Sequence, residues 1–171
     1  ITTAAIAERM GVTQGALFRH FPNKEAILQS VVRWVSERLL ARVDEAIAST
    51  SQPEAALEAV FMVHVGFVSK HPGAPRLLFG ELQRGGDSAP KRLVIELMKG
   101  YRERLMKVMA GGQATGVFDP DLDVDAAATL FIGSIQGLVM QSLMTGQVSN
   151  LKQQAQRVIP LYLRGLKPAS R

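Results

Sequence analysis

The sequence predicts an all-α fold, with a small N-terminal helix-turn-helix domain followed by a larger helical domain. Apolar residues recur at three- and four-residue steps along most of the chain. No run shows the two-residue alternation of β-branched and aromatic residues that is typical of strands. Glycines, prolines and capping residues divide the chain into about eight segments, with the short segments before Pro22 and the long ones after it.

Composition narrows the class of protein further. Hydrophobic residues make up 47% of the 171 residues and charged residues 20%, which is typical of a globular protein. The sequence has no cysteine, which excludes disulfides and thiolate nucleophiles. We see no secretory signal at the start and expect a cytoplasmic protein. The net charge of +5 favours a nucleic-acid partner, but residues 1–50 hold six Lys and Arg against five Asp and Glu, so charge alone does not locate the DNA site.

Residues 2–21 have the spacing of two short helices around a tight turn. Ile6 and Met10 would form the inner face of the first helix, and Ala7 is small where the second helix must cross closely. Gly11 would supply the positive φ that ends the first helix. Val12 would then fill the corner between the two helices.

The second helix of this motif would present a polar and small-residue face to solvent. Thr13 can cap this helix, and Leu17 and Phe21 would face inward four residues apart. The residues left at its exposed start and outer face are Gln14, Gly15, Ala16, Phe18, Arg19 and His20.

Such a helix has the side chains needed to read DNA in the major groove. Gln14 can pair with an adenine, and Arg19 can reach a guanine or a phosphate. Gly15 and Ala16 are small enough to let the backbone approach the bases. Lys24 begins the next helix, where a cation and backbone amides can together hold a phosphate.

The run GVTQGALFRHFPNKEAIL, over residues 11–28, resembles the recognition helix and following helix of TetR-family transcriptional repressors, and residues 2–7 resemble the helix before them. The resemblance implies base-reading roles for Gln14, Gly15 and Ala16. The phosphate-contacting positions that it implies are Thr2 or Thr3, Thr13, Phe18, His20 and Lys24.

Two departures from the family pattern qualify these roles. Phe18 stands where the family usually has Tyr, so the phosphate hydrogen bond of a hydroxyl group would be lost. The family also has one more helix before this motif, so we expect an N-terminal segment to precede the sequence shown.

Residues 24–48 carry one apolar stripe, interrupted only by Arg42, which predicts a long amphipathic helix that links two halves of the protein. We place the DNA-binding domain at residues 1–28 and the effector-binding and dimerisation domain at residues 29–171. The residues of the stripe are Ile27, Leu28, Val31, Val35, Leu39, Val43 and Ile47.

Residues 53–110 mix large apolar side chains with isolated polar groups. The family encloses a small-molecule pocket with its middle helices, so the resemblance implies a pocket here, suited to an apolar or amphipathic effector. A filled core stays the alternative, since Phe and Met at helical spacing are usually core residues. The candidate ligand-binding residues are Phe61, Met62, His64, Phe67, Phe79, Met98, Tyr101 and Arg102.

Residues 124–146 predict a helix with apolar residues on every face and no charge after Asp125. Its polar residues interrupt the run well before membrane-spanning length, so we expect no membrane partner. With a last helix at about residues 150–166, the resemblance implies a four-helix bundle across the two-fold axis of a homodimer. The candidate interface residues are Leu130, Gly133, Gly137, Met140 and Gln141.

These observations predict a ligand-responsive transcriptional regulator that represses by binding a palindromic operator in double-stranded DNA as a homodimer, and that a small molecule releases. We expect no catalytic residue, no cofactor and no metal site. The carboxylates at positions 119, 121, 123 and 125 lack the glycine and glutamate of a calcium loop, and we assign them to a loop and a helix N-terminus.

Two other classes of protein remain open. In a helical partner-binding protein, Gln14 and Lys24 would only pack, and alanine at both positions would leave DNA binding unchanged. In an enzyme, the central cavity would hold a substrate. The sequence offers an enzyme little support, because it has no Gly-x-Ser-x-Gly turn and its three histidines lack metal-ligand spacing on one helix face.

Overall fold

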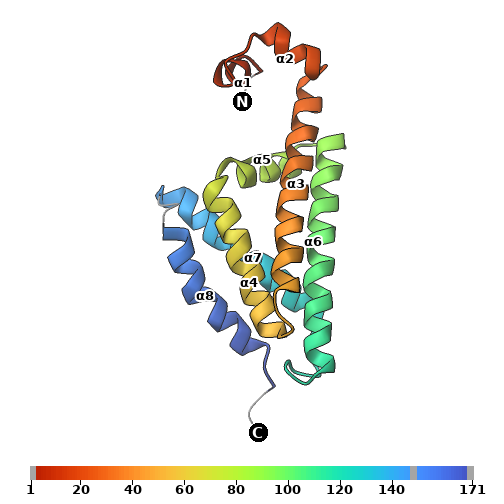
Figure 1. Cartoon of the computed structure of the whole chain (residues 1–171), viewed down its shortest axis with the longest axis vertical. Helices are drawn as coiled ribbons and strands as arrows, with labels where there is room; N and C mark the ends of the chain where they lie inside the picture. Colours follow the sequence, from red (N-terminus) through yellow and green to blue (C-terminus); the bar gives the residue numbers. More distant parts are fainter. Residues whose placement is uncertain (1–2, 147–149, 169–171) are drawn as a thin grey trace.

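The computed structural model describes residues 3–146 and 150–168, which form eight α-helices and no strand (Figure 1). This confirms the predicted all-α class and the number of segments. In chain order the helices are α1 (Thr3–Arg9), α2 (Gln14–His20), α3 (Lys24–Ala48), α4 (Pro53–Lys70), α5 (Gly73–Gln83), α6 (Ala89–Ala114), α7 (Val124–Thr145) and α8 (Leu151–Gly165).

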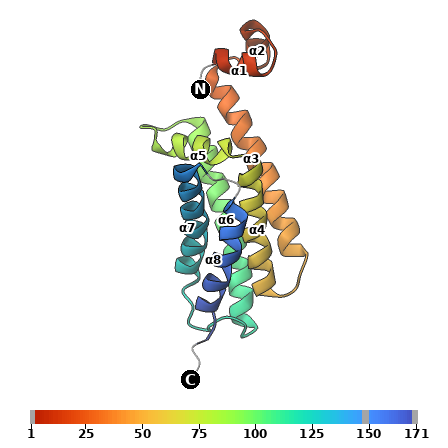
Figure 2. The same cartoon turned by 90° about the vertical axis from the view of Figure 1, so that its left-hand side faces the viewer.

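The helices are arranged as a small head on a long body. Helices α1 and α2 and the start of α3 make up the head, and α3 continues down into the body formed with α4 to α8 (Figures 1 and 2). Each part has its own hydrophobic cluster. The head cluster consists of Ala7, Leu17 and Ile27, with Ile6 and Phe21 packed against it. The body cluster takes its residues from α3, α4, α6, α7, α8 and the α6–α7 loop.

Side-chain caps set the start of four helices. The capping oxygens accept a backbone N–H three residues later, which satisfies a donor that the first helical turn leaves unpaired. The caps are Thr13 for α2 at 3.1 Å, Asn23 for α3 at 2.9 Å, Ser88 for α6 at 3.3 Å and Asp123 for α7 at 3.0 Å. Gly11 adopts a φ of +67° after α1, which confirms its predicted role as the helix stop.

Aromatic contacts hold the centre of the body together. Phe61 of α4 meets Phe131 of α7 edge to face at 5.3 Å between ring centroids. Phe131 in turn meets Tyr162 of α8 at 5.4 Å. The Tyr162 hydroxyl donates to the carbonyl oxygen of Ala127 at 2.8 Å, so its polar atom is satisfied inside the core.

Helices α3 and α6 pack side by side and are joined by a bidentate ion pair. Nε and one terminal nitrogen of Arg104 donate to the two carboxylate oxygens of Asp44 at 2.6 and 2.9 Å. These hydrogen bonds hold the pKa of Asp44 below its ordinary value. Because both side chains reach solvent, the pair contributes more to the register of α3 against α6 than to stability.

The acidic run before α7 serves the loop and the helix start, as predicted. Asp119 accepts the backbone N–H of Asp121 at 2.8 Å. Asp123 caps α7, and Asp125 in its first turn forms an ion pair with Arg102. These contacts account for the carboxylates of Asp119, Asp123 and Asp125.

The structure differs from the sequence-based expectation at two residues of the head, and it shows in addition which face of α7 is buried. Met10 and Val12 do not fill the inner corner of the head; they are 58% and 40% exposed. The reason is that α1 ends at Arg9, so both side chains belong to the turn and leave the face on which Ala7 meets α2. Helix α7 is buried along one face only, since its opposite face lies at the surface of the body.

We predict that Gly112→Ala destabilises the body. A Cβ atom at Gly112 would lie 2.1 Å from the ring of Phe118, which is fully buried and has no room to move. The expected loss is about 1–3 kcal/mol of unfolding free energy, despite the better helix propensity of alanine. Chemical denaturation measures it. Gly111→Ala is the control, because the neighbouring position is open; equal stabilities of the two variants would contradict this packing.

Candidate DNA interface and ligand cavity

Helix α2 lies at the free end of the head, away from the body (Figure 1). Leu17 is 2% exposed and fixes the inner face of the helix. Its outer face is therefore set toward solvent, and Ala16 lies half-buried at the edge. The predicted DNA-contacting residues that this face exposes are Gln14, Gly15, Phe18, Arg19 and His20.

The other predicted DNA contacts lie at helix starts. The Thr13 oxygen accepts the N–H of Ala16, and its hydroxyl proton stays available to a phosphate. Lys24 is exposed as the first residue of α3, directly after the Asn23 cap. Thr3 is half-buried at the start of α1, and Thr2 lies outside the described residues.

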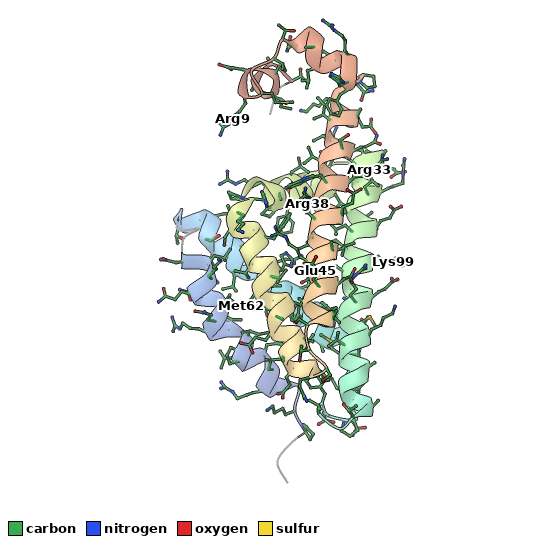
Figure 3. All side chains as sticks on the ribbon, in the orientation of Figure 1. Arg9, Arg33, Arg38, Glu45, Met62 and Lys99 are labelled. Carbon is green, nitrogen blue, oxygen red and sulfur yellow. The ribbon has the colours of Figure 1, made fainter. Side chains whose placement is uncertain are left out.

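The head also exposes residues that sequence reasoning did not select for DNA. Met10 is 58% exposed and Val12 40% exposed, and both add apolar surface near Phe18 in the chain. Arg9 extends from the end of α1 away from α2 (Figure 3). The arginine was not singled out because one exposed cation at a helix end has no distinguishing pattern.

The body contains an apolar cavity of about 640 Å³, its open mouth included. Five helices line the cavity, α3 to α7, so every element between the head and α8 has a part in it. The lining residues are Leu39, His64, Val68, Pro75, Leu78, Phe79, Leu82, Val94, Leu97, Met98, Tyr101, Ile132, Ile135, Gln136 and Val139.

The polar part of the lining is centred on a pair of aromatic residues. Nδ1 of His64 lies 2.9 Å from the hydroxyl oxygen of Tyr101, and the rings meet edge to face. Burial lowers the pKa of His64 to about 4, because the imidazolium would lose its hydration among carbon atoms. Burial also raises the pKa of Tyr101. Both groups are therefore uncharged at pH 7.

Four of the eight candidate ligand-binding residues line this cavity. They are His64, Phe79, Met98 and Tyr101. The sequence did not single out Gln136 as a ligand contact, although it contributes a third polar side chain from α7. The sequence does show Gln136 as a glutamine within an apolar helix. One polar residue in such a run, however, does not indicate which face of the helix it occupies.

The other four candidates lie outside the cavity lining. Phe61 and Phe67 are core residues, because their rings pack on Phe131 and on His71 respectively. Met62 of α4 is half-buried against the body cluster (Figure 3). Arg102 donates to Thr129 at 3.0 Å and to the carbonyl oxygen of Asp125 at 2.8 Å, so it ties α6 to the first turns of α7.

Phe67 also belongs to an aromatic group between α3 and α4. The ring of Trp34, on α3, lies 6.1 Å from that of Phe67 and 5.0 Å from that of His71. The guanidinium carbon of Arg42 lies 5.7 Å from the centroid of the Phe67 ring. Arg42, which interrupts the apolar stripe of α3, therefore places its guanidinium group over the face of an aromatic ring.

The candidate interface residues of α7 all lie at the surface. Leu130 is 61% exposed and Met140 50%, and Gly133, Gly137 and Gln141 are exposed between and beside them. The structure adds Met144 of α7, 79% exposed, and Leu161 of α8, 61% exposed, as further apolar surface. We call the exposed residues of α7 from Leu130 to Met144 the α7 stripe.

Among the described residues, α7 is the one helix long and apolar enough to cross a membrane. Length and composition are weak support for a span, and the core helix of a globular protein passes the same test. The inner face of α7 packs into the body cluster through Phe131 and Ile135.

A helical head that exposes its second helix, carried on a larger helical body with an apolar cavity, defines the class of helix-turn-helix regulators with a separate ligand-binding domain. Comparison with known proteins places the chain within this class. Residues 1–31 match the family of bacterial regulatory proteins described as the tetR family, and residues 35–165 match the YsiA-like protein C-terminal region. The chain belongs to the TetR family and is a ligand-responsive, DNA-binding transcription regulator.

Solved structures and curated relatives agree with this family. The transcriptional regulator FadR from Bacillus subtilis, in complex with stearoyl-CoA, is 25% identical with a TM-score of 0.80, over 96% of this chain and 88% of FadR. The ketosteroid transcriptional regulator KstR2 of Mycobacterium tuberculosis shares the fold, with a TM-score of 0.79. It is 24% identical to this chain, and the match covers 98% of this chain and 85% of KstR2. The nucleoid occlusion factor SlmA from a Marinomonas species is 27% identical over 139 residues, which are 81% of this chain and 71% of SlmA.

We predict that Gly15→Ala weakens DNA binding without harming the free protein. A Cβ atom at Gly15 would lie 4.0 Å from the Thr13 oxygen, so the head accommodates it, and alanine should stabilise the helix by roughly 0.5–1 kcal/mol. Against a DNA groove the added methyl group should cost about tenfold in affinity. Fluorescence anisotropy with labelled duplex DNA measures it. Gly111→Ala is the control, and an unchanged affinity of Gly15→Ala would show that the backbone there stays clear of DNA.

We also predict a loss of stability in mild acid that depends on His64. The pKa of His64 is about 4 in the folded chain against 6.5 in its ordinary state, so the unfolded chain takes up the proton first. Stability is therefore complete above pH 6.5 and falls toward pH 4, by about 2 kcal/mol between pH 6.5 and pH 5. Denaturation curves at pH 7.5 and pH 5 measure the difference. His64→Gln should flatten it, whereas an equal slope in the variant would assign the effect to other groups.

Proposed function

We propose that the chain is a cytoplasmic, homodimeric repressor whose two heads bind a palindromic operator and whose affinity for DNA falls when an amphipathic molecule with a long apolar part enters the body. The observation that carries the proposal is the cavity, because it joins five helices including the one that bears the head. The chain acts by binding and not by catalysis.

The exposed face of α2 supports the DNA part of this proposal. Gln14 and Arg19 are free to meet base edges or phosphates, and Gly15 brings little bulk between the helix axis and a groove. Lys24 follows α2 in the chain and is the first residue of α3. A phosphate there would meet a cation and the backbone N–H groups of a helix start.

The α7 stripe supports the homodimer. Leu130, Met140 and Met144 expose large apolar side chains along one helix, and a Cβ atom at Gly133 or Gly137 would meet open space. Apolar surface of this kind is typically covered in the functional state, and a two-fold axis covers a stripe with its own copy. A dimer of this kind would present two copies of α2, roughly 34 Å apart when they enter successive major grooves.

The contacts of α3 support coupling between cavity and head. Leu39 lines the cavity and Lys24 begins the same helix below α2. Near the head, the backbone N–H of Ala89, at the start of α6, donates to a carboxylate oxygen of Glu25 at 3.3 Å. A ligand that shifts α5 or α6 outward would therefore act on α3 both at Leu39 and at Glu25. This would change the spacing of the two heads.

The shape and chemistry of the cavity support an amphipathic ligand. Most of its lining is aliphatic or aromatic, as in pockets that hold apolar small molecules. The FadR structure from Bacillus subtilis contains stearoyl-CoA, whose acyl chain is of this chemical class. We therefore place an acyl chain, or an apolar group of similar bulk, inside the body.

The test combines DNA retention with the state of assembly. We expect purified chain to retard duplex DNA from the promoter of its own gene in a gel shift, and stearoyl-CoA or shorter acyl-CoA to reduce retention at least tenfold. Met140→Glu should place a charge in the dimer contact, give a monomer by analytical ultracentrifugation and lose operator binding.

Ile95→Glu is the matched control, since Ile95 is 51% exposed on α6, outside the α7 stripe. It should remain dimeric and keep its affinity for DNA. A Met140→Glu variant that stays dimeric would reject this interface, and a chain that binds no duplex specifically would reject the proposed function.

A further inference from the structure

We infer that the cavity recognises an uncharged hydrogen-bond acceptor on its ligand, such as the carbonyl oxygen of an ester, thioester or ketone, through Nε2–H of His64, and that it discriminates against a free carboxylate. This inference rests on the proposed ligand cavity and specifies which chemical class fills it.

The position of one proton follows from the hydrogen bond between His64 and Tyr101. A phenol always carries a proton, and it needs an acceptor when it is buried. Within the described residues, the Tyr101 hydroxyl has Nδ1 of His64 as its hydrogen-bond partner, at 2.9 Å. The phenol therefore donates to Nδ1. Since a neutral imidazole carries one proton, that proton is on Nε2.

The Nε2–H group opens into the cavity. In the described parts of the chain, no side-chain nitrogen or oxygen atom is both buried and without a partner. Among residues 3–146 and 150–168, none forms a hydrogen bond with Nε2 of His64, so this atom has accessible surface, and the space beside the ring is the cavity that His64 lines. The phenol of Tyr101 fixes the ring, so that the free N–H is presented in one orientation.

The charges around the cavity disfavour an anion there. The lining includes no Lys, Arg, Asp or Glu. Arg102, one residue after Tyr101, is held by Asp125 and Thr129 of α7. A carboxylate that entered would lose its hydration and find no cation, whereas a carbonyl would exchange one hydrogen bond with water for one with His64.

Helix α5 offers no free cation to an anion beside the cavity. Glu81 is 6% exposed on α5, and its carboxylate pairs with Arg84 at 3.2 Å. The neighbouring residue Leu82 lines the cavity. Behind this wall the cation of Arg84 is already paired with Glu81, so it is not free to bind an anionic ligand. Gln136, on α7, offers a neutral amide and can donate a second hydrogen bond to the same carbonyl group.

The experiment compares three ligands that share a chain of similar length: methyl decanoate, 2-undecanone and decanoate. Isothermal titration calorimetry with the full chain at pH 7.5 measures their affinities. We expect the ester and the ketone to bind at least tenfold more tightly than decanoate. The double variant His64→Leu with Tyr101→Phe removes both polar groups together, so that neither is left unpaired, and should reduce the preference to less than threefold.

Gln153→Leu is the control for exchanging a polar side chain for leucine, because Gln153 is exposed on α8 and lies outside the cavity lining. It should keep the preference of the native chain. Circular dichroism confirms that each variant is folded. The comparison of ester with acid on the native chain needs no variant and tests the inference even if the double variant fails to fold.

Decanoate that binds as tightly as the ester would overturn the inference. So would a preference that survives in the double variant and disappears in Gln136→Leu, because the amide would then be the recognising group. Gel shifts on the same samples distinguish failure of this inference from failure of the proposed function. If all three ligands bind with equal affinity and release DNA, this inference fails while the proposed function stands. If none of the three binds, both fail.

Discussion

Helix α3 belongs to both hydrophobic clusters, and this sharing is the constraint on which the rest of the structure depends. Ile27 packs with Ala7 and Leu17 in the head, while Val35, Leu39 and Val43 pack in the body. Since a continuous helix has no joint, the head cannot be repositioned without moving residues of the body cluster. In the proposed function, a change in packing around Leu39 would therefore displace α2.

Local rules made the head predictable from the sequence. A glycine at the helix stop, a threonine cap and an inward leucine each have a physical effect that depends on a few neighbouring residues, and Gly11, Thr13 and Leu17 behave as predicted. The long helix from Lys24 to Ala48 was predictable for the same reason, because its apolar stripe is interrupted only by Arg42 and its start carries a cap. The exposure of Met10 and Val12 was not predicted, because the direction of their side chains depends on the residue at which α1 ends. Helix ends are the least certain part of a sequence-based assignment.

The cavity was predictable only in part. Periodicity indicates which residues point inward, but an inward residue can meet either another side chain or empty space. Phe61 and Phe67 are enclosed by aromatic partners from other helices, and those partners depend on how the helices cross. His64 and Tyr101 were found because they are isolated polar groups among large apolar residues, and in the structure they form a hydrogen bond with each other.

The aromatic group on α3 gives this protein a built-in optical probe. Trp34 is the single tryptophan of the chain, and it lies between the head and the cavity against His71 and Phe67. Indole emission depends on polarity and on nearby quenching groups, of which a histidine ring is one. Any sliding of α3 past the end of α4 would alter that environment, so its motion should be visible in the native molecule without attaching a dye.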